Sequence, residues 1–303
     1  MSAKRNQRVQ REDVLTYSPI LKYMMIFFTA AMFIVLVGGI FISAQRMKKD
    51  ARAAHKSVET QVTNRVNESL KLLESLAVQP EYYDPSLPPL KKVEKLDRIT
   101  EKYGYMMICY VDADMNVYTI GEEPASLASR DYMQQLFSTG KPQVTDSFLA
   151  GADGVTLNYT VAYPLKKGNK ITGCLFCAIY FDDVVDILKK AVETSDAQAV
   201  LIGSKGQIMS STSNLQYGEP YIDYVREAHN IGVTADQLET ELLAKTPGTY
   251  WSYRDGNLYY TMYNNIENTD WDILTTIDFW SIYRTIISGF LVIVALMAVL
   301  CSV

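Results

Sequence analysis

Two strand-like stretches decide the fold of this chain: LNYTVAY at residues 157–163 and LYYTMY at residues 258–263. Both are rich in aromatic and β-branched residues, which fit the pleated surface of a sheet. Their Tyr-Thr pairs, Tyr159-Thr160 and Tyr260-Thr261, are 101 residues apart. A repeat of this length predicts two structurally similar modules rather than one irregular domain.

Each module begins with the same order of strand, polar turn and strand, at residues 106–120 and again at residues 199–210. The first turn, residues 112–116, has the carboxylate spacing of a calcium loop, but Val117 stands where the sharp turn of such a loop needs glycine. We therefore predict a plain hairpin turn and no metal site. Helices are expected at residues 90–102, 182–192 and 221–244.

Uncharged stretches lie near both ends of the chain. Residues 23–45 and 285–303 contain no charged side chain, and each holds eleven Ile, Leu, Val or Phe residues. About twenty residues of helix cross a hydrocarbon core of about 30 Å. The sequence therefore predicts two transmembrane helices, at residues 23–45 and 283–303, and the length of the first favours an uncleaved anchor over a signal peptide.

The orientation of these spans rests on the long segment between them. Lys and Arg flank the first span on both sides, so the positive-inside rule does not decide it. A long domain behind a first span crosses the membrane largely regardless of its charge. We expect a cytoplasmic tail at residues 1–22 and residues 46–282 outside the cell (inner) membrane.

An apolar stripe continues from the first span through residues 46–79 at a mean spacing typical of a helix. No Gly or Pro interrupts residues 47–78, and prolines at 80, 85, 88 and 89 then end the pattern. This stalk helix packs on its own domain, or its stripe also pairs with a second copy. The sequence leaves both open, and we predict a homodimer with contacts along Val58, Val62, Val66 and Leu73.

Composition excludes several function classes. The net charge is −5 and the region outside the basic tail is acidic, which argues against a nucleic-acid partner. Two histidines and no nucleophile elbow argue against an enzyme such as a membrane-anchored hydrolase, and no cofactor is expected. Cys174 and Cys177 lie on one predicted strand and face opposite ways, so we interpret them as buried apolar fillers.

The order of several short motifs resembles one known family. Arg130-Asp-Tyr132, Gly140-Lys-Pro142, Val144-Thr-Asp146, Tyr163-Pro164 and Gly173 follow one another as in the membrane-distal module of double Cache sensor domains of bacterial transmembrane receptors. Thr269-Asp-Trp271 resembles the end of the membrane-proximal module. The resemblance implies an α+β fold with tandem PAS-like modules on a long N-terminal helix, flanked by two transmembrane helices. It places the distal module at residues 80–190 and the proximal module at residues 191–282.

The same resemblance implies a ligand site in the distal module, formed by Arg130, Tyr132, Asp146, Phe148 and Tyr159. Ala178 stands where members that sense amino acids carry an Asp that pairs with the ligand ammonium. A carboxylate or a neutral metabolite is therefore the expected ligand, with Arg130 as a bidentate anion partner. The alternative is that Arg130 ties its loop to the following helix and that the aromatic residues only fill the core.

These observations predict an extracytoplasmic small-molecule sensor that transmits a signal through its helices to an output domain expected beyond residue 303. In such a receptor, a ligand acts only by binding two arrangements of the module with different affinity. A membrane-anchored structural or assembly protein without a solute ligand is the alternative from another class. It predicts that no metabolite stabilises the domain.

Overall fold

The structure, a computed structural model, describes residues 2–150 and 154–302. It consists of two compact units: residues 49–278 form one, and the chain up to Lys48 forms the other together with the C-terminal helix. Helix α1 (Ser2–Ala77) contributes to both units. The predicted helix through the first span and the stalk is therefore continuous, and it ends shortly before Pro80, where the short 3₁₀ helix η1 (Pro80–Tyr83) begins.

The described part of the smaller unit is helical and contains apolar stretches of α1 and α7. Within the described residues, α1 has one stretch, beginning at Ile26, that is long and apolar enough to cross a membrane. Helix α7 (Phe279–Ser302) begins four residues before the predicted second span. The apolar part of α7 with described side chains, Phe279–Val292, is shorter than a span requires.

The first sheet of the larger unit is antiparallel throughout, and its strands follow the order β3-β2-β1-β7-β6-β4, with β5 also paired to β6. The strands are β1 (Met107–Val111), β2 (Asn116–Tyr118), β3 (Ala125–Ser126), β4 (Gln143–Val144), β5 (Phe148–Leu149), β6 (Leu157–Lys167) and β7 (Lys170–Tyr180). Helix α2 (Pro89–Tyr103) precedes them, close to the predicted bounds, and α3 (Asp131–Thr139) lies between β3 and β4. Both helices end at a glycine in the left-handed conformation, Gly104 and Gly140, as is common at helix C-termini.

The second sheet is also antiparallel and has the order β10-β11-β12-β13-β8-β9. Its strands are β8 (Ala197–Ile202), β9 (Ile208–Ser211), β10 (His229–Ile231), β11 (Gly248–Arg254), β12 (Asn257–Asn265) and β13 (Asp272–Asp278). Helix α4 (Asp182–Val192) connects the two sheets, and α5 (Tyr221–Arg226) and α6 (Ala235–Leu243) belong to the second module. Strand β10 separates α5 from α6, so the helical stretch expected at residues 221–244 is interrupted.

The two sheets repeat the same strand order. The path β2-β1-β7-β6 in the first matches β9-β8-β13-β12 in the second. Tyr159-Thr160 therefore lies on β6 and Tyr260-Thr261 on the equivalent strand β12, as a repeated module requires. The predicted hairpin turn is also present, because the Asp112 carboxylate accepts hydrogen bonds from backbone N–H groups inside the turn.

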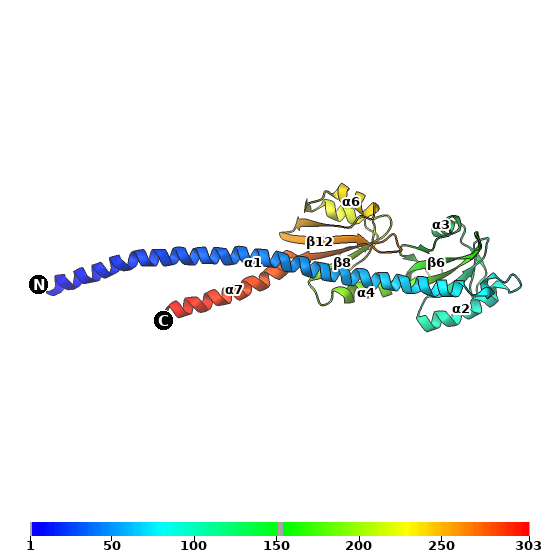
Figure 1. Ribbon diagram of the computed structural model, residues 1–303, viewed down its shortest axis with the longest axis horizontal. Helices are drawn as coiled ribbons and strands as arrows, with labels where there is room; N and C mark the ends of the chain where they lie inside the picture. The colour runs from blue at the N-terminus through cyan, green and yellow to red at the C-terminus, as the bar shows by residue number, and fades with distance from the viewer. Residues whose placement is uncertain (1, 151–153, 303) are drawn as a thin grey trace. The chain divides into compact units, whose positions relative to one another are not determined.

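The buried stripe of α1 packs against sheets of its own chain (Figure 1). His55 Nδ1 lies 3.0 Å from Thr275 Oγ1 on β13, and Tyr163 on β6 donates to Glu74 at 3.2 Å. The predicted dimer contact is wrong in its location, since the four residues named for it are 0% exposed: Val58, Val62, Val66 and Leu73. Their apolar surface is already covered within one chain, so nothing is left on them to bury against a second copy.

Candidate functional site

One face of the first sheet is covered by α3. Met133 and Leu136 of this helix are fully buried against Cys109, Cys174 and neighbouring small side chains. Cys174 Sγ lies 3.6 Å from Met133 Sδ. Cys174 thus fills the core as predicted, beside Cys109, and Cys177, also buried as predicted, lies on the alternate side of β7 together with Arg65.

Arg130 and Tyr132 lie at the beginning of α3. Arg130 occupies the N-cap position with an extended backbone and an exposed side chain, and it makes no side-chain capping bond. Tyr132 is half-buried against the sheet face, and this burial raises the pKa of its hydroxyl to about 12, against the opposing charge of Arg130. The two predicted site residues therefore lie close together at one edge of the α3 face.

The pairing of the strands brings further side chains to this face. Phe148 on β5 is opposite Asn158 on β6, and Thr160 is opposite Ala178 on β7. Paired residues in a sheet point to the same side, and Ala178 belongs to the core under α3. Phe148 thus joins Arg130 and Tyr132 on the predicted side of the sheet.

Asn158 and Thr160 supply polar groups to this face that sequence reasoning missed. Both are 2% exposed, and the Asn158 amide donates to the Phe148 carbonyl at 3.2 Å. The Thr160 hydroxyl stands beside Ala178, the position where the family resemblance implies a carboxylate. The only available signal was the Tyr-Thr repeat, in which Thr160, rather than Tyr159, faces α3.

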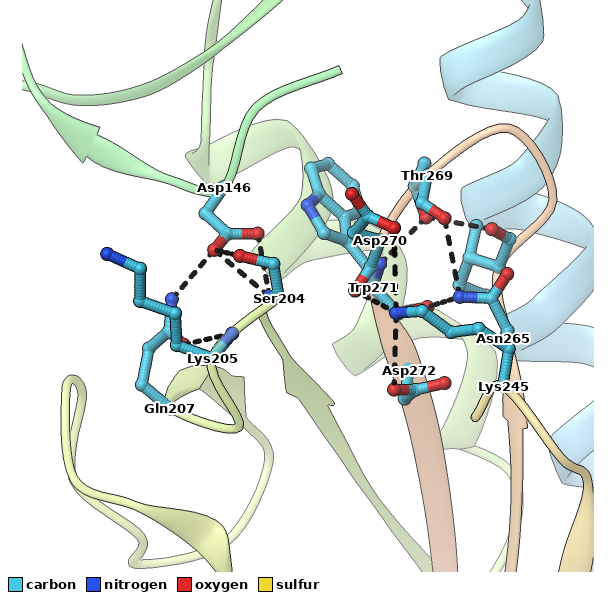
Figure 2. A network of polar contacts seen from close by, with 11 residues as sticks. Asp146, Ser204, Lys205, Gln207, Lys245, Asn265, Thr269, Asp270, Trp271 and Asp272 are labelled. Atoms are coloured by element: carbon cyan, nitrogen blue, oxygen red, sulfur yellow. Dashed lines mark hydrogen bonds and ion pairs between the residues drawn. The ribbon is translucent and has the colours of Figure 1, made fainter. Parts of the chain in front are cut away.

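Asp146 serves a different purpose from the predicted one. It lies between β4 and β5 and accepts hydrogen bonds from the turn that joins β8 and β9 in the second module (Figure 2). Ser204 donates its backbone N–H at 3.0 Å and its hydroxyl at 2.7 Å, and the Gln207 amide donates at 2.9 Å. A carboxylate held by this many donors joins the modules, so we correct its assignment as a ligand contact.

The side chains of Gln207 and Asp146 leave little room for a Cβ atom at Gly203 in that turn. A Cβ at Gly203 would lie 2.5 Å from the Gln207 amide nitrogen and 2.8 Å from the Asp146 carboxylate. Next to Asp146, the Ser147 backbone N–H lies 3.3 Å from Met209 Sδ, and Tyr217 donates to the Ser147 carbonyl at 3.2 Å. We call Asp146, Ser147 and their partners in the second module the polar junction.

Tyr159 belongs to a second contact between the modules, on the opposite face of β6. Its ring packs edge-on against Phe181, at the end of the first module, and against Trp271, whose centroid is 5.2 Å away in the second module. Tyr159 is 0% exposed, burial raises the pKa of its hydroxyl, and that hydroxyl has no hydrogen-bond partner among the described residues. The predicted place of Tyr159 beside Arg130 is therefore wrong. We call the rings of Tyr159, Phe181 and Trp271 the aromatic junction.

Of the five predicted ligand contacts, three lie at the α3 face and two join the modules. The α3 face carries an exposed guanidinium and half-buried aromatic rings next to a buried amide and a buried hydroxyl, the kinds of group that orient a small polar or anionic solute. Among the described residues, no group of three or more His, Cys, Asp or Glu side chains is placed to hold a metal. The site is thus a candidate for recognition of a small molecule.

Comparison with known proteins identifies the fold. No protein-family model matches the sequence, and no curated protein matches it. The extracellular domain of mmHK1S-Z2, a protein assigned as a histidine kinase, is similar over 80% of this chain and 99% of its own, with 13% identity and a TM-score of 0.60. That of rpHK1S-Z16, assigned likewise, matches 78% of this chain and 95% of its own, with 15% identity and a TM-score of 0.58.

A chemoreceptor has the same arrangement. The sensory domain of Campylobacter jejuni Tlp3 with isoleucine bound matches 83% of this chain and 98% of its own, with 12% identity and a TM-score of 0.57. At such identities the likeness shows the fold and leaves ligand and output to other evidence. The α+β fold of tandem modules on a long helix, implied by the resemblance to double Cache domains, is thus confirmed. The two flanking transmembrane helices are not part of this likeness and stay a prediction.

Proposed function

We propose that this chain is a membrane receptor that senses a small solute outside the cytoplasmic membrane and transmits the event through its helices. The observation that carries the proposal is the short path from the α3 face to the second module. Phe148 faces the candidate site, and Asp146, two residues earlier, is bound to the turn at Ser204. A shift of this segment on ligand binding changes the polar junction and so biases one arrangement of the modules.

The proposed ligand is a small carboxylate or a neutral metabolite. The guanidinium of Arg130 is exposed and makes no hydrogen bond or ion pair with the described side chains, so it is free to form a bidentate contact with an anion. Tyr132 and Phe148 would flank the solute, while Asn158 and Thr160 offer hydrogen bonds. Ala178 provides no negative charge, which disfavours an ammonium group at that position.

The test is a metabolite screen on the full chain in detergent, followed by calorimetric titration with the solute that stabilises it. Arg130→Ala is expected to weaken binding about ten- to a hundredfold, because charge-assisted bonds are lost. Arg130→Lys should recover little, since an ammonium lacks the planar fork. Arg98→Ala, at an exposed arginine on α2, is the matched control and should bind as the wild type does.

Two outcomes contradict the proposal. Undiminished affinity in Arg130→Ala would move the site away from the α3 face. If no solute in the screen stabilises the chain, the structural or assembly role becomes the better interpretation.

We also propose the predicted topology, with both termini cytoplasmic, spans in α1 and α7, and residues 46–282 outside. Asn214 is exposed in the second module and offers a labelling position. Cys109, Cys174 and Cys177 are buried, which protects them from an impermeant reagent, and Cys301 is replaced by Ser. Asn214→Cys should be labelled in intact cells, and labelling only after lysis would reverse the topology.

A homodimer remains part of the proposal, with pairing through the exposed side of α1 in place of the buried stripe. Thr60 and Asn64 lie on that exposed side, one helical turn apart. Thr60→Cys and Asn64→Cys should form disulfide-linked dimers in membranes. Val62→Cys, which is buried within the chain, is the control expected to give none.

A further inference from the structure

The second module contains a pocket that the proposed function does not use. It encloses about 70 Å³ at the end of the sheet where the turn between β8 and β9 meets the start of β13. Its lining combines that turn with parts of α5, α6 and the following loop; the residues used below are Ile202, Ser204, Lys205, Tyr221, Glu239, Leu242, Leu243, Lys245 and Asp272. The pocket is separate from the α3 face, which lies in the other module.

Asp272 is the buried charge of this pocket. Its side chain is 5% exposed, and the ammonium of Lys245 is 3.8 Å from Asp272 Oδ2, beyond hydrogen-bond distance. Lys245 instead donates to the backbone carbonyl of Asp270 at 2.7 Å (Figure 2). Burial raises the pKa of Asp272 to about 6, while Lys245 and the Asn265 amide act to lower it.

A carboxylate accepts about four hydrogen bonds. The Asn265 amide donates to the Trp271 carbonyl at 2.7 Å, and the Lys245 ammonium is 3.8 Å away. Asp272 is therefore left with unused acceptor capacity, although a buried charge is costly without strong partners. A ligand that donates directly to this carboxylate would therefore gain a charge-assisted hydrogen bond at a position already enclosed by protein.

A second carboxylate, Glu239, also lines the pocket, but it is 47% exposed and pairs with Arg226 at 3.3 Å. The wall around Asp272 is otherwise apolar on the side of α5 and α6. Ile202, Tyr221 and Leu242 are buried, and Leu243 lies at the rim with 63% exposure. At about 10–15 Å³ for each enclosed water, the pocket holds roughly five waters, or a solute with a similar number of non-hydrogen atoms. Such a solute would have a short aliphatic part.

We propose that this pocket is a second ligand site, which binds a small solute with a primary ammonium group and a short aliphatic chain. The ammonium donates to Asp272, and the chain packs against Tyr221 and Leu242. The Ser204 turn, which lines the pocket, also holds Asp146, so the occupant contacts the segment that joins the modules. The buried charge of this site is the anion of Asp272, whereas the charged group at the α3 face is the exposed cation of Arg130.

The experiment titrates the full chain in detergent with n-propylamine and, separately, with L-alanine. Both carry the ammonium, and only alanine adds a carboxylate, to which Lys205 or Lys245 could donate a hydrogen bond. Tighter binding of alanine would assign the site to small amino acids, and binding of propylamine alone would assign it to simple amines. Either result supports the proposal.

Asp272→Asn keeps the shape of the side chain and should weaken binding at least tenfold. Asp270→Asn is the matched control: its carboxylate is equally 3.8 Å from Lys245 but its side chain is 70% exposed, and it does not line the pocket. Asp270→Asn should therefore bind as the wild type does. Leu243→Trp, at the rim, should block the pocket without disturbing the buried charge.

Three results would overturn the proposal. The first is no binding of either probe up to about 10 mM, which corresponds to less than about 3 kcal/mol of affinity. The second is wild-type affinity in both Asp272→Asn and Leu243→Trp. The third is a loss of affinity in Asp270→Asn equal to that in Asp272→Asn, because it would show that any nearby negative charge attracts the probe.

Discussion

The two modules are alike on the face of their sheets toward α1 and differ on the opposite face. On the side of α1, both sheets bury a tyrosine of the Tyr-Thr repeat, Tyr159 at 0% and Tyr260 at 8% exposure, and α1 packs on both sheets. On the opposite side, the first module carries α3 with Arg130 at its edge, whereas the second is closed by a larger cluster that includes Tyr221, Tyr250 and Tyr263.

The difference indicates that the α1 side holds the modules together and that the opposite side is free to differ in function. Phe181 and Trp271 add to the α1 side a ring contact that spans both modules. Substitutions there should cost stability, and substitutions at the edge of α3 should cost almost none. The following predictions test this contrast in decreasing order of expected effect.

The largest effect is expected for Trp271→Ala in the aromatic junction. Trp271 is 0% exposed and contacts Tyr159 and Phe181, so its loss leaves a cavity between the modules. Removal of a buried aromatic ring costs about 3–5 kcal/mol. Chemical denaturation should show this loss, and Trp251→Ala, at a half-buried tryptophan on β11, should lose less than half as much.

A smaller effect is expected for Asp146→Ala in the polar junction. The change removes charge-assisted hydrogen bonds to Ser204 and Gln207, with an expected cost of about 1–3 kcal/mol. Gly203→Ala should act similarly, because its Cβ would collide with the Asp146 carboxylate. If Asp146→Ala is no less stable than Asp114→Ala, an exposed turn variant, the junction carries no stability.

The stability of the folded chain should also depend on pH through His55, on the α1 side. Burial lowers the pKa of its imidazole, against the opposing effect of Glu59 and the Asn264 amide. Below a pH of about 6.5 the unfolded chain then binds the proton more readily than the folded chain, so stability falls as pH falls. His55→Gln should remove this slope.

Asp272 contributes to the pH dependence of stability with the opposite sign. The measurement therefore has to separate the contributions of His55 and Asp272. With a folded pKa of about 6, Asp272 takes up its proton in the folded state first, so its contribution to stability rises as pH falls from 7 to about 5. Denaturation at several pH values should therefore compare the wild type with His55→Gln and with Asp272→Asn. Parallel curves for wild type and His55→Gln would contradict the prediction.

The smallest effect on stability is expected for Arg130→Ala. Arg130 is the N-cap residue of α3, but its side chain is exposed and makes no capping hydrogen bond, so its removal should change stability by less than about 0.5 kcal/mol. Thermal denaturation without ligand should superimpose on that of the wild type. A large loss would show that Arg130 ties its loop to α3 and would support a structural role.

Local patterns predicted much of the fold. The apolar stripe and the prolines predicted a stalk helix to residue 79, close to the observed end of α1 at Ala77, and α2 ends at Tyr103, close to the predicted residue 102. The Tyr-Thr repeat identified equivalent strands because both copies have the same position relative to their sheet. Such features depend on residues within a few turns or strands of one another, so they can be predicted from the sequence.

The site was predicted only in part, since side chains on one strand divide between two faces. Tyr159 and Thr160 are adjacent, and β6 sends the tyrosine toward α1 and the threonine toward α3. Asp146 finds its donors 58 residues further along the chain. Asp272 lies 27 residues from Lys245, and neither carries a motif that signals a pocket.

The sequence by itself determined the apolar segments, the long helix, the repeated strands and the presence of Arg130 at the start of a helix. Periodicity and turn chemistry act over short distances, and they fix these elements wherever the rest of the chain lies. Only the tertiary structure decided which face each side chain occupies and which partner it meets. It covered the α1 stripe within the chain, gave Asp146 to the second module and enclosed Asp272, because burial and hydrogen bonding depend on segments that meet only after folding.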